Sequence, residues 1–264
     1  MNGMLQIANI SWRFIRVWNR NMLVYRRIWF VNLLVPLFEP LLYLAAFGVG
    51  LSALVGRVQY HGEEISYIVF IAPALLAITM MYNSFFENTY ASFVRMYYQK
   101  TFDAMLATPL SMEDIIAGEI AWGATKSVIA TTIVLAVVSF FRLVYYPHAL
   151  LILPLSFLGG LAFGTIGMIF TGLVPSIEMF NLPIFLFITP MFLFSGTFFP
   201  ISALPGWAQT LSSALPLTHL VNLCRAFCLG EITPDLTWSI AYITIMFVLL
   251  FPIALMVMRK KLIN

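Results

Sequence analysis

Acidic and apolar residues are interleaved in one short stretch of the chain, TFDAMLATPLSMEDIIAGE, residues 101–119. Four of the eleven acidic residues lie in it, although only 9% of the whole chain is charged. Ser111 and Asp114 have the spacing of a capping box, and Pro109 stands just before the point where a helix can begin. The stretch therefore predicts a helix that starts near Met112.

A second, shorter helix is expected just upstream, over residues 98–107. Phe102, Met105 and Leu106 share one side of this helix. Lys100 and Asp103 keep the rest of it polar. A helix that is apolar on one side and charged on the other suits docking into a groove of a partner protein. An ordinary interfacial loop is the alternative.

A carboxylate at Glu39 lies deep in an apolar stretch, VPLFEPLLYLAAFGVGL, between Pro36 and Pro40. An ionised side chain inside a membrane is costly, so Glu39 is expected to face the protein interior or a water-filled path. The alternative is a buried hydrogen bond between helices. Glu87, in SFFENTY, is expected near the end of the next apolar stretch, as an interfacial or pairing residue.

The sequence offers little for catalysis by this chain. In GEIAWGATKS, Gly118 and Gly123 have the spacing of a phosphate loop, but Ala124 and Thr125 separate them from Lys126, so the motif is rejected. The histidines at 61, 148 and 219 show no metal-ligand spacing. An intramembrane enzyme would need Glu39 and His219 to converge. A passive channel would need polar spans.

The composition indicates a membrane protein, because 61% of the 264 residues are hydrophobic, against about 45–50% in soluble domains. A membrane-spanning helix needs about 20 mostly apolar residues. The N-terminus lacks the pattern of a cleavable signal peptide. Six stretches qualify as spans: 29–55, 67–92, 120–141, 149–173, 179–199 and 237–258.

Lysine and arginine give the orientation. If the N-terminus is cytosolic and six spans alternate, eleven basic residues lie on the cytosolic side and three on the far side, which is a strong positive-inside bias. Both termini and residues 101–119 are then cytosolic. The cytosolic set is Arg13, Arg16, Arg20, Arg26, Arg27, Arg95, Lys100, Lys126, Arg259, Lys260 and Lys261; the far set is Arg57, Arg142 and Arg225.

Two further segments differ from simple spans. Residues 7–29 place aromatic residues on one helical side and arginines opposite, which is typical of a helix in the headgroup layer. After the fifth span, prolines break a long apolar segment into short pieces. This favours re-entrant helices dipping from the outer face, with a surface loop as the alternative. Cys224 and Cys228 are expected to be small buried side chains rather than a disulfide.

The run Thr101–Ser127, TFDAMLATPLSMEDIIAGEIAWGATKS, resembles the cytosolic coupling region of type 2 ABC transporter permeases. It is most similar to the nodulation protein J branch, whose members export lipo-oligosaccharides. FEPLLYLAAFGVGL (38–51), SGTFFPISALP and PLTHLVNLCR (within 195–225) resemble the same family, and the order and spacing agree over most of the chain.

The resemblance implies an all-α permease in a bacterial inner membrane. It would be one domain, 1–264, with an interfacial helix at 1–28, a coupling region at 95–118 and an outer re-entrant segment at 200–235. Two copies would work with two copies of a cytosolic ABC ATPase and with membrane lipid, and without nucleic acid. ATP-Mg would bind the partner, and this chain would hold no cofactor or metal and would not be an enzyme.

The resemblance also implies roles for particular residues. The expected cargo is a glycolipid, lipo-oligosaccharide or lipid-linked polysaccharide, with efflux of a hydrophobic drug as the alternative. Glu39 and Glu87 are placed at the translocation path or the dimer seam. The coupling set is Lys100, Phe102, Asp103, Leu106, Pro109, Asp114 and Glu119; the outer-gate set is Gly196, Phe198, Phe199, Pro200, Pro216 and His219.

Overall fold

Long helices run side by side through the whole molecule in the computed structural model, which describes residues 10–51, 56–60 and 62–263. Six helical segments are long and apolar enough to cross a membrane, as the sequence predicted. They are Trp29–Phe47, Tyr67–Tyr98, Met112–Phe140, His148–Leu173, Ile177–Phe194 and Leu236–Ile263. The chain is an all-α integral membrane protein.

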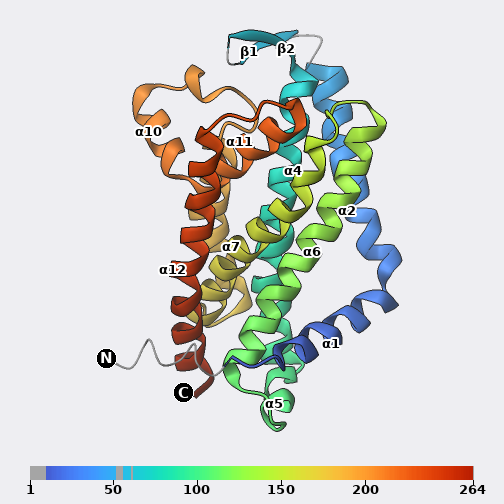
Figure 1. The fold of residues 1–264 in the computed structure, drawn as a ribbon. Helices are drawn as coiled ribbons and strands as arrows, with labels where there is room; N and C mark the ends of the chain where they lie inside the picture. Colours follow the sequence, from blue (N-terminus) through green and yellow to red (C-terminus); the bar gives the residue numbers. More distant parts are fainter. Residues whose placement is uncertain (1–9, 52–55, 61, 264) are drawn as a thin grey trace.

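The first two helices form an elbow at the edge of the bundle (Figure 1). The helix α1, Phe14–Arg27, ends at Ile28, whose backbone is not helical (φ −118°, ψ 26°), and α2, Trp29–Tyr43, follows directly. Residues 7–9 of the predicted amphipathic helix lie outside the described residues. Continuing α2, residues Leu44–Leu51 form a π-helical segment, η2. The break at Ile28 lets α1 slope across the end of the bundle while α2 rises along its side.

The second span is not a regular α-helix throughout. It begins as α4, Tyr67–Phe86, and continues through two π-helical segments, η3 (Glu87–Ala91) and η4 (Val94–Tyr98). A reversal at Lys100, whose φ is +52°, leads into the short helix α5, Thr101–Leu106. A single-turn π-segment inserts an extra residue, rotates the side chains that follow it, and is frequent at functional sites.

The third span starts where the capping box predicted. The helix α6, Met112–Phe140, begins after Ser111, whose hydroxyl accepts a hydrogen bond from the Asp114 N–H at 3.0 Å. Asp114 Oδ2 in turn accepts from the Ser111 N–H at 3.2 Å. The fourth span contains η5, His148–Leu151, and α7, Ile152–Leu173. The fifth contains η6 (Ile177–Phe180), α8 (Asn181–Pro183), η7 (Ile184–Ile188) and α9 (Thr189–Phe194).

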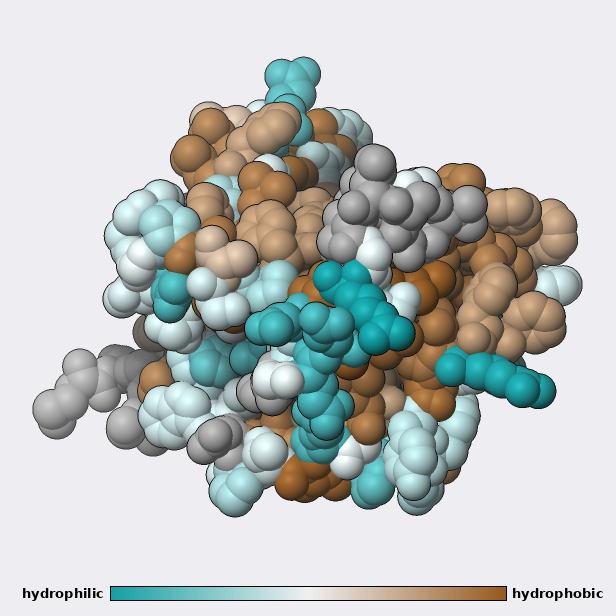
Figure 2. All heavy atoms as spheres, turned by 90° about the horizontal axis from the view of Figure 1, so that it is seen from above, coloured by the Kyte–Doolittle hydropathy of each residue, from teal (hydrophilic) through white to brown (hydrophobic). Residues whose placement is uncertain are grey.

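A polar hairpin stands at the end of the bundle opposite α5 (Figure 1). Its strands, β1 (Arg57–Tyr60) and β2 (Glu63–Ser66), pair antiparallel with Arg57 opposite Ser66. This hairpin was not predicted from the sequence. We call this end of the molecule the hairpin end and the opposite end the α5 end. Seen from above, hydrophilic side chains gather near the centre of the hairpin end (Figure 2).

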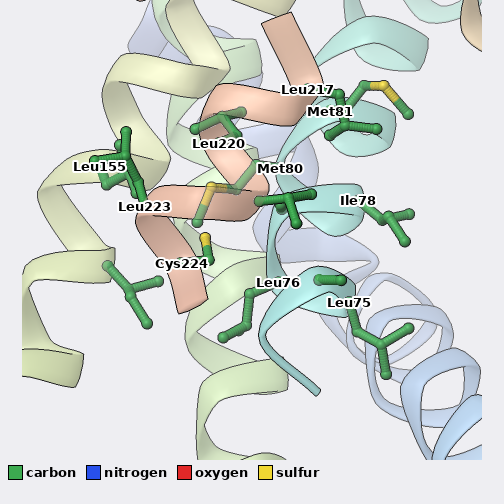
Figure 3. Close-up of a cluster of buried hydrophobic side chains, with 14 of the residues drawn as sticks. Leu75, Leu76, Ile78, Met80, Met81, Leu155, Leu217, Leu220, Leu223 and Cys224 are labelled. Carbon is green, nitrogen blue, oxygen red and sulfur yellow. The ribbon is translucent and has the colours of Figure 1, made fainter. Parts of the chain in front are cut away.

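Two short helices follow the fifth span at the hairpin end, in the segment where prolines predicted broken pieces. After η8, Ile201–Ala203, come α10, Gly206–Ala214, and α11, Pro216–Leu229. Figure 3 shows α11 lying against α4, with Cys224 close to Met80, while Leu223 lies beside Leu155. Cys224 and Cys228 are both free and buried. The last span is α12, Asp235–Ile263.

Glycines on α7 set its close contacts with α6 and with α4. A Cβ added at Gly160 would lie 2.7 Å from the Ala124 Cα, and one at Gly164 would lie 2.7 Å from the Ser84 hydroxyl. Small residues at such spacing let membrane helices approach until their backbones touch. Gly160 and Gly164 therefore have a packing role in the bundle.

We expect Gly160→Ala to destabilise the protein by about 1–3 kcal/mol, because the added methyl group meets backbone and forces two helices apart. Gly206→Ala is the matched control, since a Cβ at Gly206 meets nothing within 4 Å. Thermal unfolding of both variants, purified in detergent and followed by tryptophan fluorescence, compares them. Equal melting temperatures for the two variants would contradict the packing role.

Candidate functional site

The short helix α5 presents an exposed tip at the α5 end (Figure 1). The side chain of Asp103 is 61% exposed and that of Lys100 is 67% exposed, and their nitrogen–oxygen distance is 3.9 Å. An exposed pair at that distance contributes little to stability. Pro109 is also exposed, whereas Leu106 is half-buried. These are the residues of the predicted coupling set that a partner protein could reach.

Phe102 is the anchor of α5 rather than part of its exposed surface. Its side chain is completely buried and packs in a cluster with Phe93, Met96 and Ile115. The sequence placed Phe102 in the coupling set, and the structure puts it behind the exposed surface of α5. On a helix of six residues, the apolar side is the one that holds the helix against its own protein.

Asp114 is likewise buried and has two structural tasks. Besides capping α6, its Oδ1 accepts a hydrogen bond from the Ser11 N–H at 2.7 Å. Beside it, Arg13 Nη1 donates to the Pro109 carbonyl at 2.6 Å. The residues leading into α1 are therefore tied to the loop between α5 and α6. Because its side chain is buried, Asp114 is not available for direct contact with a partner.

Four charged side chains meet above α5 and form what we call the charge network: Glu87, Arg95, Glu119 and Lys126. Arg95 Nη1 lies 2.7 Å from Glu87 Oε1, and Arg95 Nη2 lies 2.5 Å from Glu119 Oε2. Lys126 Nζ lies 2.8 Å from Glu87 Oε2. Both carboxylates are buried, with exposed side-chain fractions of 5% for Glu87 and 0% for Glu119. Two acids and two bases leave the network without net charge.

Neutral groups supply the remaining hydrogen bonds of the two carboxylates. Glu119 accepts from Asn21 Nδ2 at 2.8 Å and from the Ser92 hydroxyl at 2.6 Å. Glu87 accepts from Trp122 Nε1 at 3.0 Å. A buried ion pair is tolerated only when such extra hydrogen bonds satisfy its lone pairs. The network therefore joins three elements, α1, the π-helical part of the second span, and α6.

The helix α1 is also held to α6 outside the network. Trp18 Nε1 donates to the Thr125 hydroxyl at 2.8 Å, and the Tyr25 ring meets the Trp122 ring edge-on with centroids 5.5 Å apart. Gly118 permits this contact, because a Cβ there would lie 2.6 Å from the Val17 Cβ. The predicted aromatic side of α1 thus faces the bundle.

The sequence predicted only part of the charge network. Glu119 was assigned to the coupling set and Glu87 to the path or seam and to a pairing role; the structure puts both in one buried cluster, in which Glu87 is paired. In the sequence, Arg95 and Lys126 indicated only the orientation of the chain in the membrane. One signal was available: Glu119, Trp122 and Lys126 are spaced i, i+3, i+7, which puts them on one side of α6.

An open groove of about 750 Å³ lies beside the network, between α1, α2 and the second span. Glu39 and Glu87 both line it, together with Arg95 and Lys126. Glu39 is exposed to the groove and has no ion-pair or hydrogen-bond partner among the described residues. The structure therefore places Glu39 in a polar opening rather than between tightly packed helices.

The predicted outer-gate residues lie at the hairpin end, in two groups. Gly196 has φ +69°, a conformation that favours glycine, and it turns the chain after α9. The Phe198 ring packs on Phe192 and Phe47 at centroid distances of 5.0 and 5.3 Å, and its carbonyl accepts from the Tyr67 hydroxyl at 3.1 Å. Phe199 is 39% exposed, and Pro200 is half-buried at the end of this turn.

The second group contains Pro216 and His219, both on α11. Pro216 occupies the first turn of that helix, where its missing N–H costs nothing. His219 is buried and lies within 3.2 Å of the Ser239 hydroxyl and 3.1 Å of the Ser213 carbonyl, stacked on Tyr242. These contacts connect α11 to α12. None of these partners is Glu39, which lines the groove beside the charge network.

Arg225 is an important residue of the hairpin end that sequence reasoning did not assign. It is 1% exposed, and its guanidinium lies 3.7 Å from the centroid of the Phe70 ring. It donates to the carbonyls of Phe70 at 3.1 Å and Gly196 at 2.5 Å. Carbonyl groups and an aromatic face hold this cation in place. Arg225 therefore fixes the turn after α9 to α4 and α11.

The site combines buried ion pairs with an open groove inside a bundle of helices long and apolar enough to span a membrane. Among the residues that the structure describes, there is no group of three or more His, Cys, Asp or Glu side chains that could hold a metal ion. Its acids are paired or face an open groove, and its helices span a membrane. The fold and the site define a multi-pass membrane permease.

Comparisons with known proteins identify the family. The ABC-2 type transporter family matches residues 13–229, and the chain belongs to that family. It is 39% identical to nodulation protein J of Rhizobium meliloti (strain 1021) over 84% of this chain and 83% of the relative. It is 37% identical to nodulation protein J of Rhizobium leguminosarum bv. trifolii over 97% and 96% of the two chains.

A more distant relative is the inner membrane transport permease YadH of Escherichia coli (strain K12), 25% identical over 81% of this chain and 82% of the relative. Together these matches confirm the resemblance seen in the coupling stretch. The protein is a multi-pass permease subunit of an ABC exporter in an inner membrane.

We expect Arg95→Met to destabilise the protein by about 3–5 kcal/mol, because it leaves the buried Glu119 carboxylate without a cation and Glu87 with Lys126 alone. Arg57→Met is the control: its pair with Glu64 is exposed, at 3.9 Å, and such pairs contribute about 0–1 kcal/mol. Thermal unfolding in detergent measures both. Adding Glu119→Gln to Arg95→Met should recover part of the loss. The network would be refuted if Arg95→Met melted like Arg57→Met.

Proposed function

We propose that this chain is the membrane half of an ATP-driven exporter, working as two copies with two copies of a separate cytosolic ABC ATPase. Membership of the ABC-2 family supports the ATPase partner. ATP-Mg would bind and be hydrolysed in that partner, and this chain would convert the motion into movement of cargo. It would hold no cofactor of its own.

The exposed tip of α5 is the observation that carries the proposal. It is a short polar helix that projects from the bundle and is anchored behind by Phe102. Arg95 lies in η4, only a few residues before α5, and is locked to Glu87 and Glu119. A push on α5 would therefore be transmitted to the charge network and to α1. The contact surface is assigned to Lys100, Asp103, Leu106 and Pro109.

The proposed cargo is an amphiphile: a glycolipid, a lipo-oligosaccharide or a lipid-linked polysaccharide. The similarity to nodulation protein J over nearly the whole chain supports this class. So does the groove, whose lining combines charged, amide and aromatic side chains. A purely hydrophobic drug would gain little from Glu39 and would lose the hydration of that carboxylate.

The proposed orientation puts the α5 end in the cytosol and the hairpin end outside. The positive-inside bias supports it. In this orientation α10 and α11 dip into the outer half of the membrane. Most of α11 is buried against the protein, which is what a broken segment at membrane depth requires. The turn at Gly196, with Phe198 and Phe199, would then close the path outward.

The α5 contact is tested with exposed positions, because a charge at buried Phe102 would unfold the loop. We expect Asp103→Lys to weaken ATPase association roughly tenfold, a loss of about 1.4 kcal/mol, without lowering the melting temperature. Glu64→Lys, at the hairpin end, is the charge-matched control. Co-purification of the ATPase and its hydrolysis rate with the permease provide the readouts. If Asp103→Lys left association with the ATPase unchanged, the docking role of α5 would be refuted.

Orientation is tested by cysteine labelling in a background with Cys224 and Cys228 replaced by alanine. Ser202 and Ala104 are both exposed and lie toward opposite ends of the bundle. We expect Ser202→Cys to react with a membrane-impermeant maleimide from the periplasm and Ala104→Cys only after the cells are opened. The reverse pattern would overturn the orientation and, with it, the outward role of the Gly196 turn.

A further inference from the structure

The groove beside the charge network has the size and location of a ligand site. Its volume of about 750 Å³ lies within the range of about 300–1,000 Å³ typical of small-molecule pockets. It extends from Arg20 and Tyr25 on α1 to Glu39 on α2. At about 1.5 Å per residue, the rise from Asn32 to Glu39 is about 10 Å. The groove thus runs from the headgroup layer into the membrane.

The charges around the groove balance one another. Arg95 and Lys126 are bound to the carboxylates of Glu87 and Glu119. Arg20 is the remaining cation of the lining, and Glu39 is the remaining anion. A phosphate or sulfate would meet one spare arginine and one opposing carboxylate. The groove therefore favours a ligand without net charge.

Several polar groups of the lining have no protein partner. Among the described residues, no hydrogen bond is made by the carboxylate of Glu39, the side-chain amides of Asn32 and Gln99, or the hydroxyls of Tyr82 and Tyr90. Together they offer acceptors and donors in about equal measure. A ligand rich in hydroxyl groups, each of which both donates and accepts, would satisfy them.

Aromatic rings supply the other half of the lining. Tyr25, Tyr82, Phe86, Tyr90 and Trp122 all contribute to the groove. Tyr82 is stacked on Phe86 with ring centroids 5.5 Å apart, which gives a broad flat surface. Such faces are apolar while their edges reach polar groups. The C–H faces of sugar rings fit them, since a pyranose is apolar above and below and polar at its rim.

We propose that this groove binds the uncharged sugar rings of an amphiphilic saccharide, before transport, at the α5 half of the membrane. The acyl chain of the ligand would lie outside the groove along α2, where Phe38 and Leu42 are exposed. Glu39 would accept hydrogen bonds from sugar hydroxyls, which accounts for a carboxylate kept at that depth. This inference rests on the proposed function, because it assigns a site to the exporter's cargo.

The test uses the full chain in nanodiscs of neutral phospholipid and three photoreactive amphiphiles with the same dodecyl tail. One carries a maltosyl headgroup, one an octaethylene glycol headgroup and one a phosphate, each with a diazirine beside the headgroup. We expect the maltoside to label peptides containing Asn32–Glu39 and Tyr82–Tyr90 at least several-fold more than the other two probes. Free maltotriose should reduce that labelling.

Variants localise the contact. Glu39→Ala and Tyr82→Phe should each lower labelling by the maltoside severalfold while leaving labelling by the glycol probe unchanged. Glu64→Ala removes an exposed carboxylate at the hairpin end and should change neither. If the glycol probe labels the groove as strongly as the maltoside, the groove is a lipid crevice and the inference fails. Preference for the phosphate probe also overturns it.

The inference and the proposed function can fail separately. If the complex assembles with its ATPase and hydrolyses ATP but shows no preference for the maltoside, the proposed exporter function stands and the proposed sugar site is refuted. If the maltoside labels the groove preferentially but the chain never binds an ABC ATPase, the sugar site stands and the proposed exporter function is refuted. Both measurements are made on the same nanodisc preparation.

Discussion

The pairing of Arg95 with Glu87 and Glu119 is the interaction on which the α5 half of the molecule depends. A guanidinium fork can hold two carboxylates at once, which an ammonium group cannot do in the same fixed geometry. Arg95 uses that property to join carboxylates from two different spans. Taking these charges out of water is costly, and the neighbouring hydrogen bonds of Asn21, Ser92 and Trp122 offset that cost.

The π-helical segments explain how one span can supply both Glu87 and Arg95. These residues are eight apart, and on a regular α-helix their directions would differ by about 80°. Each π-segment adds a residue to a turn and shifts the positions that follow it. The observed distance of 2.7 Å between Arg95 Nη1 and Glu87 Oε1 depends on that shift. The π-helical segments and the ion pairs between Glu87 and Arg95 thus occur together in the second span.

The sequence predicted the spans and the start of α6 because both depend on local patterns. A span must be apolar over about 20 residues, and a capping box is defined by two residues three apart. The charge network could not be predicted in the same way, since Glu87 and Glu119 come from different spans and no local pattern pairs them. Phe102 was misplaced for a related reason. A six-residue helix shows which residues share a side, but not whether that side faces its own bundle or a partner.

Arg225, which is buried, and Arg95, whose side chain is 12% exposed, are held in different ways. Arg95 lies among carboxylates, and its network is neutral. Arg225 is held by backbone carbonyls and by the Phe70 ring. Carbonyl contacts depend on where the backbone lies, so Arg225 keeps its hydrogen bond to the Gly196 carbonyl only while that turn keeps its position.

Any outward movement of that turn would take hydrogen bonds from a buried cation, and the charge would then need water or a new partner. A closed outer turn is therefore the state that the Arg225 contacts favour. At the other end of the bundle, the ion pairs of Arg95 join side chains to side chains and can follow a moving helix. Under the proposed function, the hairpin end would resist opening, whereas the α5 end would carry displacement from α5 to α1 and the groove.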